Sequence, residues 1–305
     1  MKILVTGGAG FIASHVTDGF IDKGHDVVVL DNMSMGHLKN LNPKAKFVLM
    51  DIRALELSKL FEMEAFDAVC HHAAQMDVRL SVQDPLYDAD VNVKGTLNLL
   101  QNCVKHGVKK VLFASTGGAV YGEQNAFPCD ETHPTQPISP YGITKLSAEK
   151  YIFFYSVEYG LKYGILRYAN VYGPRQSPHG EAGVVAIFCK KILAGDNPII
   201  NGDGKQTRDY VYVGDVVQVN LKVLAYEQND IFNVGTGIET DVNAIFRMVN
   251  ASAAGKAKEV HGPPKAGEQR RSVISSAKAK ALLNWEPKTV FEDGIQKTVD
   301  YFKGL

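Results

Sequence analysis

The sequence has no excess of either charge: 33 Lys and Arg residues balance 33 Asp and Glu residues in a chain of 305. A neutral chain offers no general attraction to nucleic acid or to an anionic membrane, so any anion must be bound by local groups. Cysteines are also few, and Cys70, Cys103, Cys129 and Cys189 form no CxxC pair. This spacing argues against a zinc site or a disulfide framework, and it suits a reducing compartment.

Long apolar runs are missing as well. Glycines and Asp18 interrupt the first apolar stretch before it reaches the length of a signal-peptide core or a membrane span. We therefore expect a soluble, cytoplasmic protein that binds no membrane, nucleic acid or metal. What the chain does have is 45% hydrophobic residues, enough for a large core, and a length typical of about two domains.

Two kinds of segment alternate in the first half of the chain. Strand-like apolar runs occur at "KILVT", "HDVVVLD", "KFVLMD", "FDAVCHHAA" and "VKKVLFAST", and apolar residues at helical spacing occur in "FIASHVTDGFIDKG" and "NVKGTLNLLQNCVKHG". This alternation predicts an α/β fold with a doubly wound parallel sheet. Turn-forming residues become frequent after about residue 172, so we expect a smaller C-terminal region to begin there.

A glycine-rich turn, "TGGAGFIASH", follows the first predicted strand and opens the first predicted helix. In a Rossmann-type turn, Gly7 permits the tight bend, Gly10 lets the backbone approach a pyrophosphate, and the third position, here Ala13, serves only helix packing. Asp31 ends the second predicted strand about 20 residues later, where a carboxylate binds the adenosine ribose. Since that carboxylate would repel a 2′-phosphate, the sequence favours NAD over NADP.

The residues after the third predicted strand allow two interpretations. Asp51 and Ile52 are placed to flank the adenine of a dinucleotide, but they are equally compatible with a strand-end cap and a core residue. The sequence leaves both open.

The stretch "SPYGITKLSAEKY" carries a possible acid–base pair. Ser139 followed by Pro140 is typical of a helix start, which places Tyr141 and Lys145 on one face at i and i+4. A nearby ammonium and a nicotinamide cation would favour the tyrosine phenolate and make it a usable base. Upstream, Ser115 and Thr116 end a predicted strand and offer hydroxyls to the same substrate oxygen.

Taken together, these motifs resemble the extended short-chain dehydrogenase/reductases, and within them the NAD-dependent nucleotide-sugar 4-epimerases typified by UDP-glucose 4-epimerase. The resemblance covers nearly the whole chain, at "TGGAGFIASH", "LDN", "DIR", "HHAAQMDVRLSVQDP", "NVKGTLNLL", "STGGAVYG", "YGITK", "LRYANVYGPRQ", "RDYVYVGDV" and "FNVGTG".

The resemblance implies a reaction and a set of roles. Tyr141 would take the proton of the sugar 4-hydroxyl of a UDP-hexose, retained NAD would take the hydride from C4, and the 4-keto sugar would turn before the hydride returns. Lys145 would also bond the nicotinamide ribose. It further implies that the cofactor is lined by Phe11, Ile12, Asn32, Ala73, Ala74 and Gln75 and supported by Asn92.

Substrate contacts follow from the same resemblance. Asn170 and Arg208 would bind the diphosphate, although Arg208 has a structural alternative in an ion pair with Asp209 or Asp215. Lys265 stands where the family usually has a phosphate-binding arginine, and Ser272 aligns with a position that limits the group at sugar C2, so a serine leaves room for an N-acetyl group. Arg79 is left open between a surface position and a substrate contact.

The resemblance also implies an organisation. Residues 1–172, with returning segments near 208–236, would bind NAD, and residues 173–207 and 237–305 would bind the nucleotide sugar. The helices around "NVKGTLNLLQNCVKHG" and "SPYGITKLSAEKYIFFYSVEYG" are the pair that forms a homodimer contact in this family.

Several alternatives remain. A 4,6-dehydratase needs an acid pair after the strand-end threonine, where this chain has Gly117, Gly118 and Ala119. Thr116 is favoured over Ser115 as the substrate hydroxyl, but "STGGAVYG" is one residue longer than the commonest family form. A UDP-glucuronate epimerase or decarboxylase uses the same scaffold, and a non-catalytic NAD-binding regulator would have no reason to keep Tyr141 with Lys145.

Because adjacent strand residues face opposite ways, His71 and His72 are expected to pack rather than to bind a metal.

Overall fold

A computed structural model of the chain describes residues 1–178, 183–265 and 269–305. Its larger sheet has seven strands in the order β10-β6-β5-β4-β1-β2-β3, and every neighbouring pair is parallel. The strands are β1 (Lys2–Thr6), β2 (Asp26–Asp31), β3 (Lys46–Leu49), β4 (Ala68–His71), β5 (Lys110–Thr116), β6 (Lys162–Tyr168) and β10 (Asp230–Val234). The predicted doubly wound sheet is confirmed. Its strand order reverses between β1 and β4, where such sheets open a ligand crevice at the strand carboxyl ends.

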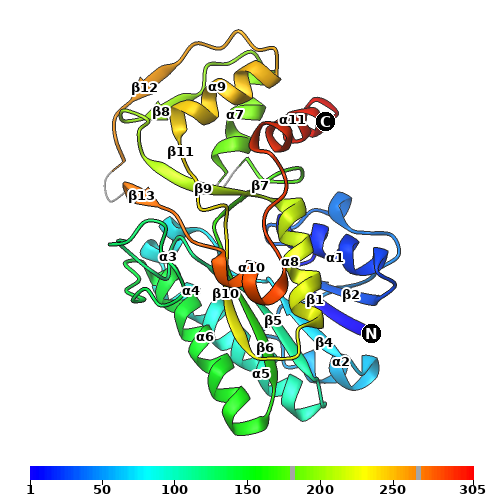
Figure 1. Cartoon of the computed structure of the whole chain (residues 1–305). Coiled ribbons are helices and arrows are strands. Elements are labelled where there is room, and N and C mark those ends of the chain that lie inside the picture. Colours follow the sequence, from blue (N-terminus) through cyan, green and yellow to red (C-terminus); the bar gives the residue numbers. More distant parts are fainter. Residues whose placement is uncertain (179–182, 266–268) are drawn as a thin grey trace.

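Helices cover both faces of this sheet (Figure 1). Val27 and Val29 of β2 pack into one apolar cluster, and Val28 and Leu30 pack into the other, so the strands are buried on both sides. One face carries α1 (Phe11–Asp22), α8 (Val213–Ala225) and α10 (Ala277–Leu283); the other carries α2 (Leu57–Glu64), α5 (Gly95–Lys105) and α6 (Pro140–Tyr159).

A run of short helices leads from β4 to α5. It comprises α3 (Val78–Gln83), α4 (Pro85–Ala89) and a π-helical turn over Asp90–Lys94. Asp77 caps α3 by accepting a hydrogen bond from the Arg79 amide at 2.8 Å, and Asp84 caps α4 through the Tyr87 amide at 2.9 Å. These caps begin each helix where the chain changes direction. Both α3 and α4 pack against α6.

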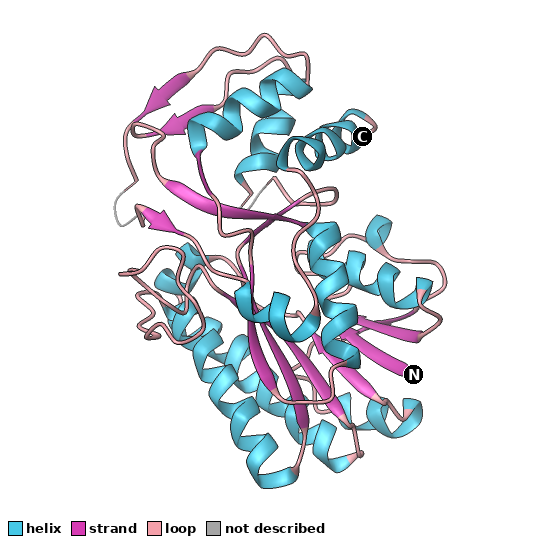
Figure 2. Ribbon diagram, in the orientation of Figure 1, coloured by secondary structure: helices cyan, strands magenta, loops and turns pink. Residues whose placement is uncertain are grey.

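The C-terminal region has its own small sheets (Figure 2) and its own apolar cluster. Strand β9 pairs with β7, β11 and β13, β8 pairs with β12, and apolar side chains of α7, α9 and α11 pack beneath them. Its elements are β7 (Asn170–Tyr172), α7 (Val184–Leu193), β8 (Ile199–Asn201), β9 (Thr207–Tyr212), β11 (Glu239–Asp241), α9 (Val242–Ser252), β12 (Val260–Gly262), β13 (Arg271–Ser272) and α11 (Phe291–Lys303). Between β9 and β11 the chain returns to the larger sheet as α8 and β10, which ties the two regions together.

Membrane-spanning helices and clustered metal ligands are both absent from the described residues. None of the helices in these ranges combines the length and apolarity needed to cross a membrane. The same residues contain no group of three or more His, Cys, Asp or Glu side chains placed to hold a metal ion.

Candidate active site

The glycine turn between β1 and α1 lies against the end of β4. Gly7 has a φ of +72°, and a Cβ there would lie 2.8 Å from the Ala73 amide nitrogen, so only glycine fits. The Gly10 amide donates to the Gly7 carbonyl at 2.9 Å, which closes the turn. Gly10 is also the N-cap of α1 and supplies no side-chain cap, while Ala13 is buried in the apolar cluster beneath the helix. A bare, close-packed helix start of this kind fits a pyrophosphate.

Asp31 is fixed beside this turn. One carboxylate oxygen accepts a hydrogen bond from the Ala9 amide at 3.0 Å, and the other accepts one from the Met33 amide at 2.8 Å. The side chain is buried at the end of β2, and each oxygen keeps a further lone pair for a ribose hydroxyl. Phe11 and Ile12 begin α1 directly after the turn. These residues therefore fit NAD.

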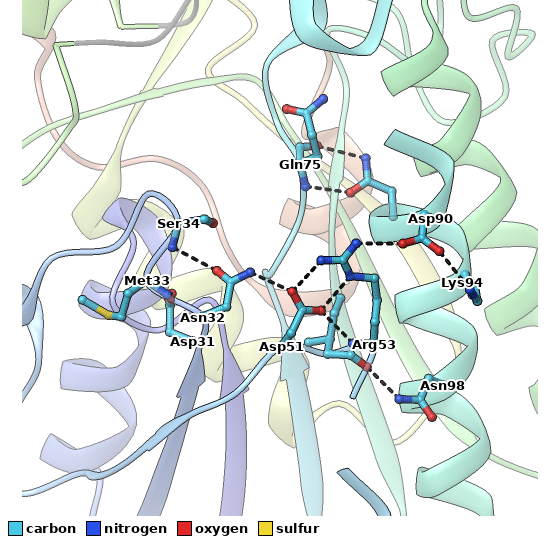
Figure 3. Close-up of polar contacts among 12 residues, drawn as sticks. Asp31, Asn32, Met33, Ser34, Asp51, Arg53, Gln75, Asp90, Lys94 and Asn98 are labelled. Atoms are coloured by element: carbon cyan, nitrogen blue, oxygen red, sulfur yellow. Dashed lines mark hydrogen bonds and ion pairs between the residues drawn. The ribbon is translucent and has the colours of Figure 1, made fainter. Parts of the chain in front are cut away.

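A charged network joins the ends of β2 and β3 to the π-helical turn (Figure 3). Arg53 donates to Asp51 through Nε at 2.9 Å and through NH2 at 2.8 Å, and its NH1 donates to Asp90 at 2.7 Å. Asn32 Nδ2 donates to the same Asp51 carboxylate at 2.8 Å. The Arg53 hydrogen bonds hold the pKa of Asp51 well below its ordinary value. Ile52 is buried against the start of α5, so it is a core residue. Asp51 is paired with Arg53 after the end of β3, and the sequence did not predict this partner.

The segment after β4 is held by paired amides. The Gln75 amide donates to Asn92 Oδ1 at 2.8 Å, and Asn92 Nδ2 donates back to the Gln75 carbonyl at 2.9 Å. Gln75 Nε2 also donates to the buried Asp88 carboxylate at 2.8 Å. Ala73 and Ala74 are thereby fixed beside the glycine turn, the place expected of residues that line a dinucleotide.

His71, at the end of β4, adds further hydrogen bonds that hold the segment after this strand. Thr96 donates its hydroxyl to the Asn92 carbonyl at 2.6 Å, so the 2.9 Å contact from His71 Nε2 must be a donated N–H. Nδ1 is then an acceptor for the Thr6 hydroxyl at 2.7 Å, and Thr6 accepts the Ala73 amide at 3.2 Å. Burial lowers the pKa of His71 well below its ordinary value, in agreement with a neutral ring.

His72 faces the other side of β4, as strand alternation predicts. Its ring stacks on Tyr168 with the ring centroids 6.0 Å apart, and Nε2 lies 3.2 Å from the Tyr168 hydroxyl. Burial lowers the pKa of His72 to about 3, so it is a neutral packed histidine.

Helix α6 carries Tyr141 and Lys145, the residues predicted to form an acid–base pair. It begins as predicted, with the Ser139 hydroxyl accepting the Gly142 amide at 3.2 Å. Lys145 is buried, with Nζ 4.3 Å from the centroid of the Phe113 ring. Burial lowers the pKa of Lys145 to about 8. Burial raises the pKa of Tyr141 above its ordinary value, and nearby Asp88 adds to the rise, so the protein alone does not favour the phenolate and a further positive charge is needed.

The two hydroxyls at the end of β5 have different surroundings. Ser115 is buried and donates its hydroxyl to Glu149 Oε1 at 2.5 Å. Thr116 is half-buried and lies where β5 ends. A Cβ on Gly118 would lie 3.9 Å from both Thr116 Oγ1 and Asn170 Oδ1. The same point is 4.0 Å from Ser272 Oγ. Three polar groups from β5, β7 and β13 thus surround one space.

The remaining candidate substrate residues lie in the C-terminal region or on short helices. Arg208 on β9 is in register with Ser272 on β13. The Asp209 carboxylate accepts the amides of Thr236 and Gly237 at 2.8 and 3.0 Å, so it is bound by the turn after β10. Lys265 and Arg79 are exposed, Lys265 after β12 and Arg79 on α3.

Comparisons with known proteins identify the family. The family model described as "NAD dependent epimerase/dehydratase family" matches residues 3–235. The chain belongs to this family. A putative UDP-glucose 4-epimerase of Methanocaldococcus jannaschii is 48% identical over 99% of this chain and 98% of its own length. The crystal structure of the Thermotoga maritima UDP-glucose 4-epimerase with UDP-glucose is 49% identical, has a TM-score of 0.97, and is matched over 100% of this chain and 99% of that one. The Thermus thermophilus UDP-glucose 4-epimerase complex with NAD is 43% identical, with a TM-score of 0.95, over 100% and 99% of the two chains.

Proposed function

We propose that this protein is an NAD-dependent UDP-glucose 4-epimerase that interconverts UDP-galactose and UDP-glucose. The observation that carries the proposal is the joining of the acid–base helix to the cofactor loop: Thr144, the neighbour of Lys145, donates to Asp88 at 2.7 Å, and Asp88 also binds Gln75 and Asn92. Full-length relatives described as UDP-glucose 4-epimerases support the same assignment.

When bound, NAD supplies the acceptor for the electron pair at sugar C4 and later gives that pair back. The work of the chain is to hold and move one proton. Tyr141 takes the proton of the 4-hydroxyl and returns it to the 4-oxygen from the same site, while Thr116 hydrogen-bonds that oxygen. Lys145 follows Tyr141 by one turn of α6, and its ammonium together with the cationic nicotinamide would favour the phenolate. No net oxidation results, so no added cofactor is consumed.

The diphosphate is assigned to Asn170 and Arg208, whose guanidinium fork matches phosphate oxygens. Lys265 adds a point charge, and the small Ser272 leaves space for a C2 N-acetyl group, so UDP-N-acetylgalactosamine is a second substrate to test. A 4,6-dehydratase is disfavoured since an acid at Gly117 would start with a Cβ 2.7 Å from the Ile274 side chain. Uronic acid substrates are the remaining alternative.

The test is product analysis by NMR after incubation of pure protein with UDP-galactose, and separately with UDP-N-acetylgalactosamine, without added NAD. We expect conversion of UDP-galactose to UDP-glucose, and release of NAD from the denatured protein. If neither sugar is converted while NAD is bound, the 4-epimerase assignment fails, and UDP-glucuronate is the next substrate to add.

We further propose a cytoplasmic homodimer formed through α5 and α6. Tyr155 is buried in the core of the larger sheet, but Tyr151, Phe154 and Tyr159 on α6 are 40%, 50% and 54% exposed. An aromatic surface of this extent is typical of a protein interface. Sedimentation at micromolar concentration should give a dimer, and a monomer would contradict this part of the proposal.

A further inference from the structure

A buried ion pair lies one helical turn beyond Lys145 on α6. Glu149 and Arg167 of β6 are 2% and 3% exposed. Arg167 NH2 lies 2.6 Å from Glu149 Oε2, and Arg167 Nε lies 3.0 Å from Oε1. Tyr141, Lys145 and Glu149 are spaced at i, i+4 and i+8 on α6. Glu149 therefore lies on the same face of the helix as the proposed acid–base pair.

The hydrogen bonds of this pair continue on both sides. Ser115, at the end of β5, donates to Glu149 Oε1 at 2.5 Å. Arg167 NH1 donates to the Tyr121 hydroxyl at 2.9 Å, and Tyr121 donates to Asn233 Oδ1 on β10 at 2.7 Å. The network thus ties α6 to three strands, and one of those strands ends in Thr116.

Stability alone does not account for a pair in this position. Removing two charges from water is costly, and apolar residues of similar volume often stabilise a fold as well or better than a buried ion pair. A charged pair next to an acid–base helix therefore points to a role that an apolar pair would not perform.

Four elements place charged, titratable or aromatic side chains around Lys145. Glu149 follows it by one turn of the same helix and Tyr141 precedes it by one turn, Asp88 lies on α4, and the neutral rings of His71 and His72 lie at the end of β4. From β5, the face of the Phe113 ring lies under the ammonium. Glu149 and Asp88 are the two carboxylates of this set.

We propose that Glu149, held by Arg167, is a positioning residue that keeps Lys145 charged and fixes α6 against the strand end bearing Thr116. The inference rests on the proposed function, because it gives Glu149 its part in the same proton transfer. Glu149 itself touches neither the sugar nor the cofactor.

The electrostatics agree with this role. Burial lowers the pKa of Lys145 to about 8, while Glu149 and Asp88 oppose that fall. Loss of the Glu149 charge lowers the Lys145 pKa further, so the ammonium is lost at a lower pH. The alkaline limb of the activity profile, where the ammonium deprotonates, then moves to lower pH.

The deciding variant is the double substitution Glu149→Leu/Arg167→Met, which removes both charges and keeps the volume packed. We expect it to fold and to retain NAD, but to move the alkaline limb of kcat/KM for UDP-galactose down by about 1 pH unit. NMR titration of ¹³Cε-labelled lysine, assigned with Lys145→Met, should show the same fall in the Lys145 pKa. Glu149→Asp keeps the charge and should retain most of the wild-type profile.

A double variant with wild-type Lys145 titration and pH profile would overturn the inference and leave the pair a structural one. If that variant is unstable, Glu149→Gln/Arg167→Gln removes the same two charges and keeps hydrogen-bonding side chains, and an unchanged Lys145 titration in it is equally decisive. The wild-type protein separates the two proposals: absence of epimerisation there refutes the proposed function, whereas the lysine titration still tests the role of Glu149.

Discussion

The two regions of the molecule place their polar groups differently. In the larger region two hydrogen-bonded networks, those of His71 and of Glu149 with Arg167, are closed and buried. In the C-terminal region the pairs of Arg271 with Glu239 and of Arg270 with Asp203 lie at the surface, with side chains 25% to 59% exposed. The difference agrees with the proposed division, in which the first region would fix the acid–base geometry and the second would surround the substrate with more exposed edges. This division suits a reaction in which the protein must keep one geometry while the sugar presents two faces.

The largest effect is expected from Gly7→Ala. The new Cβ would lie 2.8 Å from the Ala73 amide and force the glycine turn away from the end of β4. We expect protein purified without bound NAD and without activity in the absence of added cofactor. Gly24→Ala is the matched control, because Gly24 has a similar φ of +80° but open space around its Cβ position. It should cost about 1 kcal/mol of stability and leave the NAD content unchanged, and equal NAD loss in both variants would contradict the assignment of the turn.

Tyr141→Phe is expected to be the next most severe. Removing the proton acceptor should lower kcat by roughly 10³-fold, within the range of general acid–base catalysis. The fold and the NAD content should not change, because the aromatic ring remains. Turnover by NMR together with released NAD measures both, and a kcat near that of wild type would refute the role of Tyr141.

Arg208→Gln tests the C-terminal side of the comparison. Loss of a charge-assisted phosphate contact, worth roughly 1.5–3 kcal/mol, should raise the KM for UDP-galactose about 10- to 100-fold and leave NAD bound. Initial rates over a range of substrate concentrations separate KM from kcat. A fall in NAD content with unchanged KM would contradict the assignment of Arg208 to the substrate diphosphate.

Thr116→Val should have the smallest effect of the four. Removing one hydrogen bond to the 4-oxygen, worth about 1 kcal/mol, should lower kcat by about 5-fold with little change in KM. Ser115→Ala is the natural comparison, since Ser115 donates to Glu149 instead of facing the space between Asn170 and Ser272. If Ser115→Ala lowers kcat more than Thr116→Val, the choice between the two hydroxyls is reversed.

The fold of the larger region was accessible from sequence because its signals are local. Each buried parallel strand is a short apolar run, and α6 begins where Ser139 and Pro140 predict. Asp31 likewise follows from its distance to the glycine turn.

The networks could not be predicted in the same way, because they join residues far apart in sequence. Nothing near Arg53 identifies Asp90 as its partner, and nothing near Arg167 identifies Glu149. One signal was available for Glu149, which continues the spacing of Tyr141 and Lys145 by four residues. In the C-terminal region strands of two to six residues carry little periodicity, so Arg208 and Ser272 were found through family resemblance rather than through physical pattern.

Strand β10 has a consequence for synthesis of the protein. It forms the edge of the larger sheet beside β6, but residues 169–229 separate the two strands in the chain. A nascent chain that has already emerged through β6 therefore carries an unpaired strand edge until residue 234 leaves the ribosome, after much of the C-terminal region has been made. The larger sheet is therefore incomplete until β10 has emerged. A chain that ends before Asp230 should be recovered as aggregate instead of as a cofactor-binding domain.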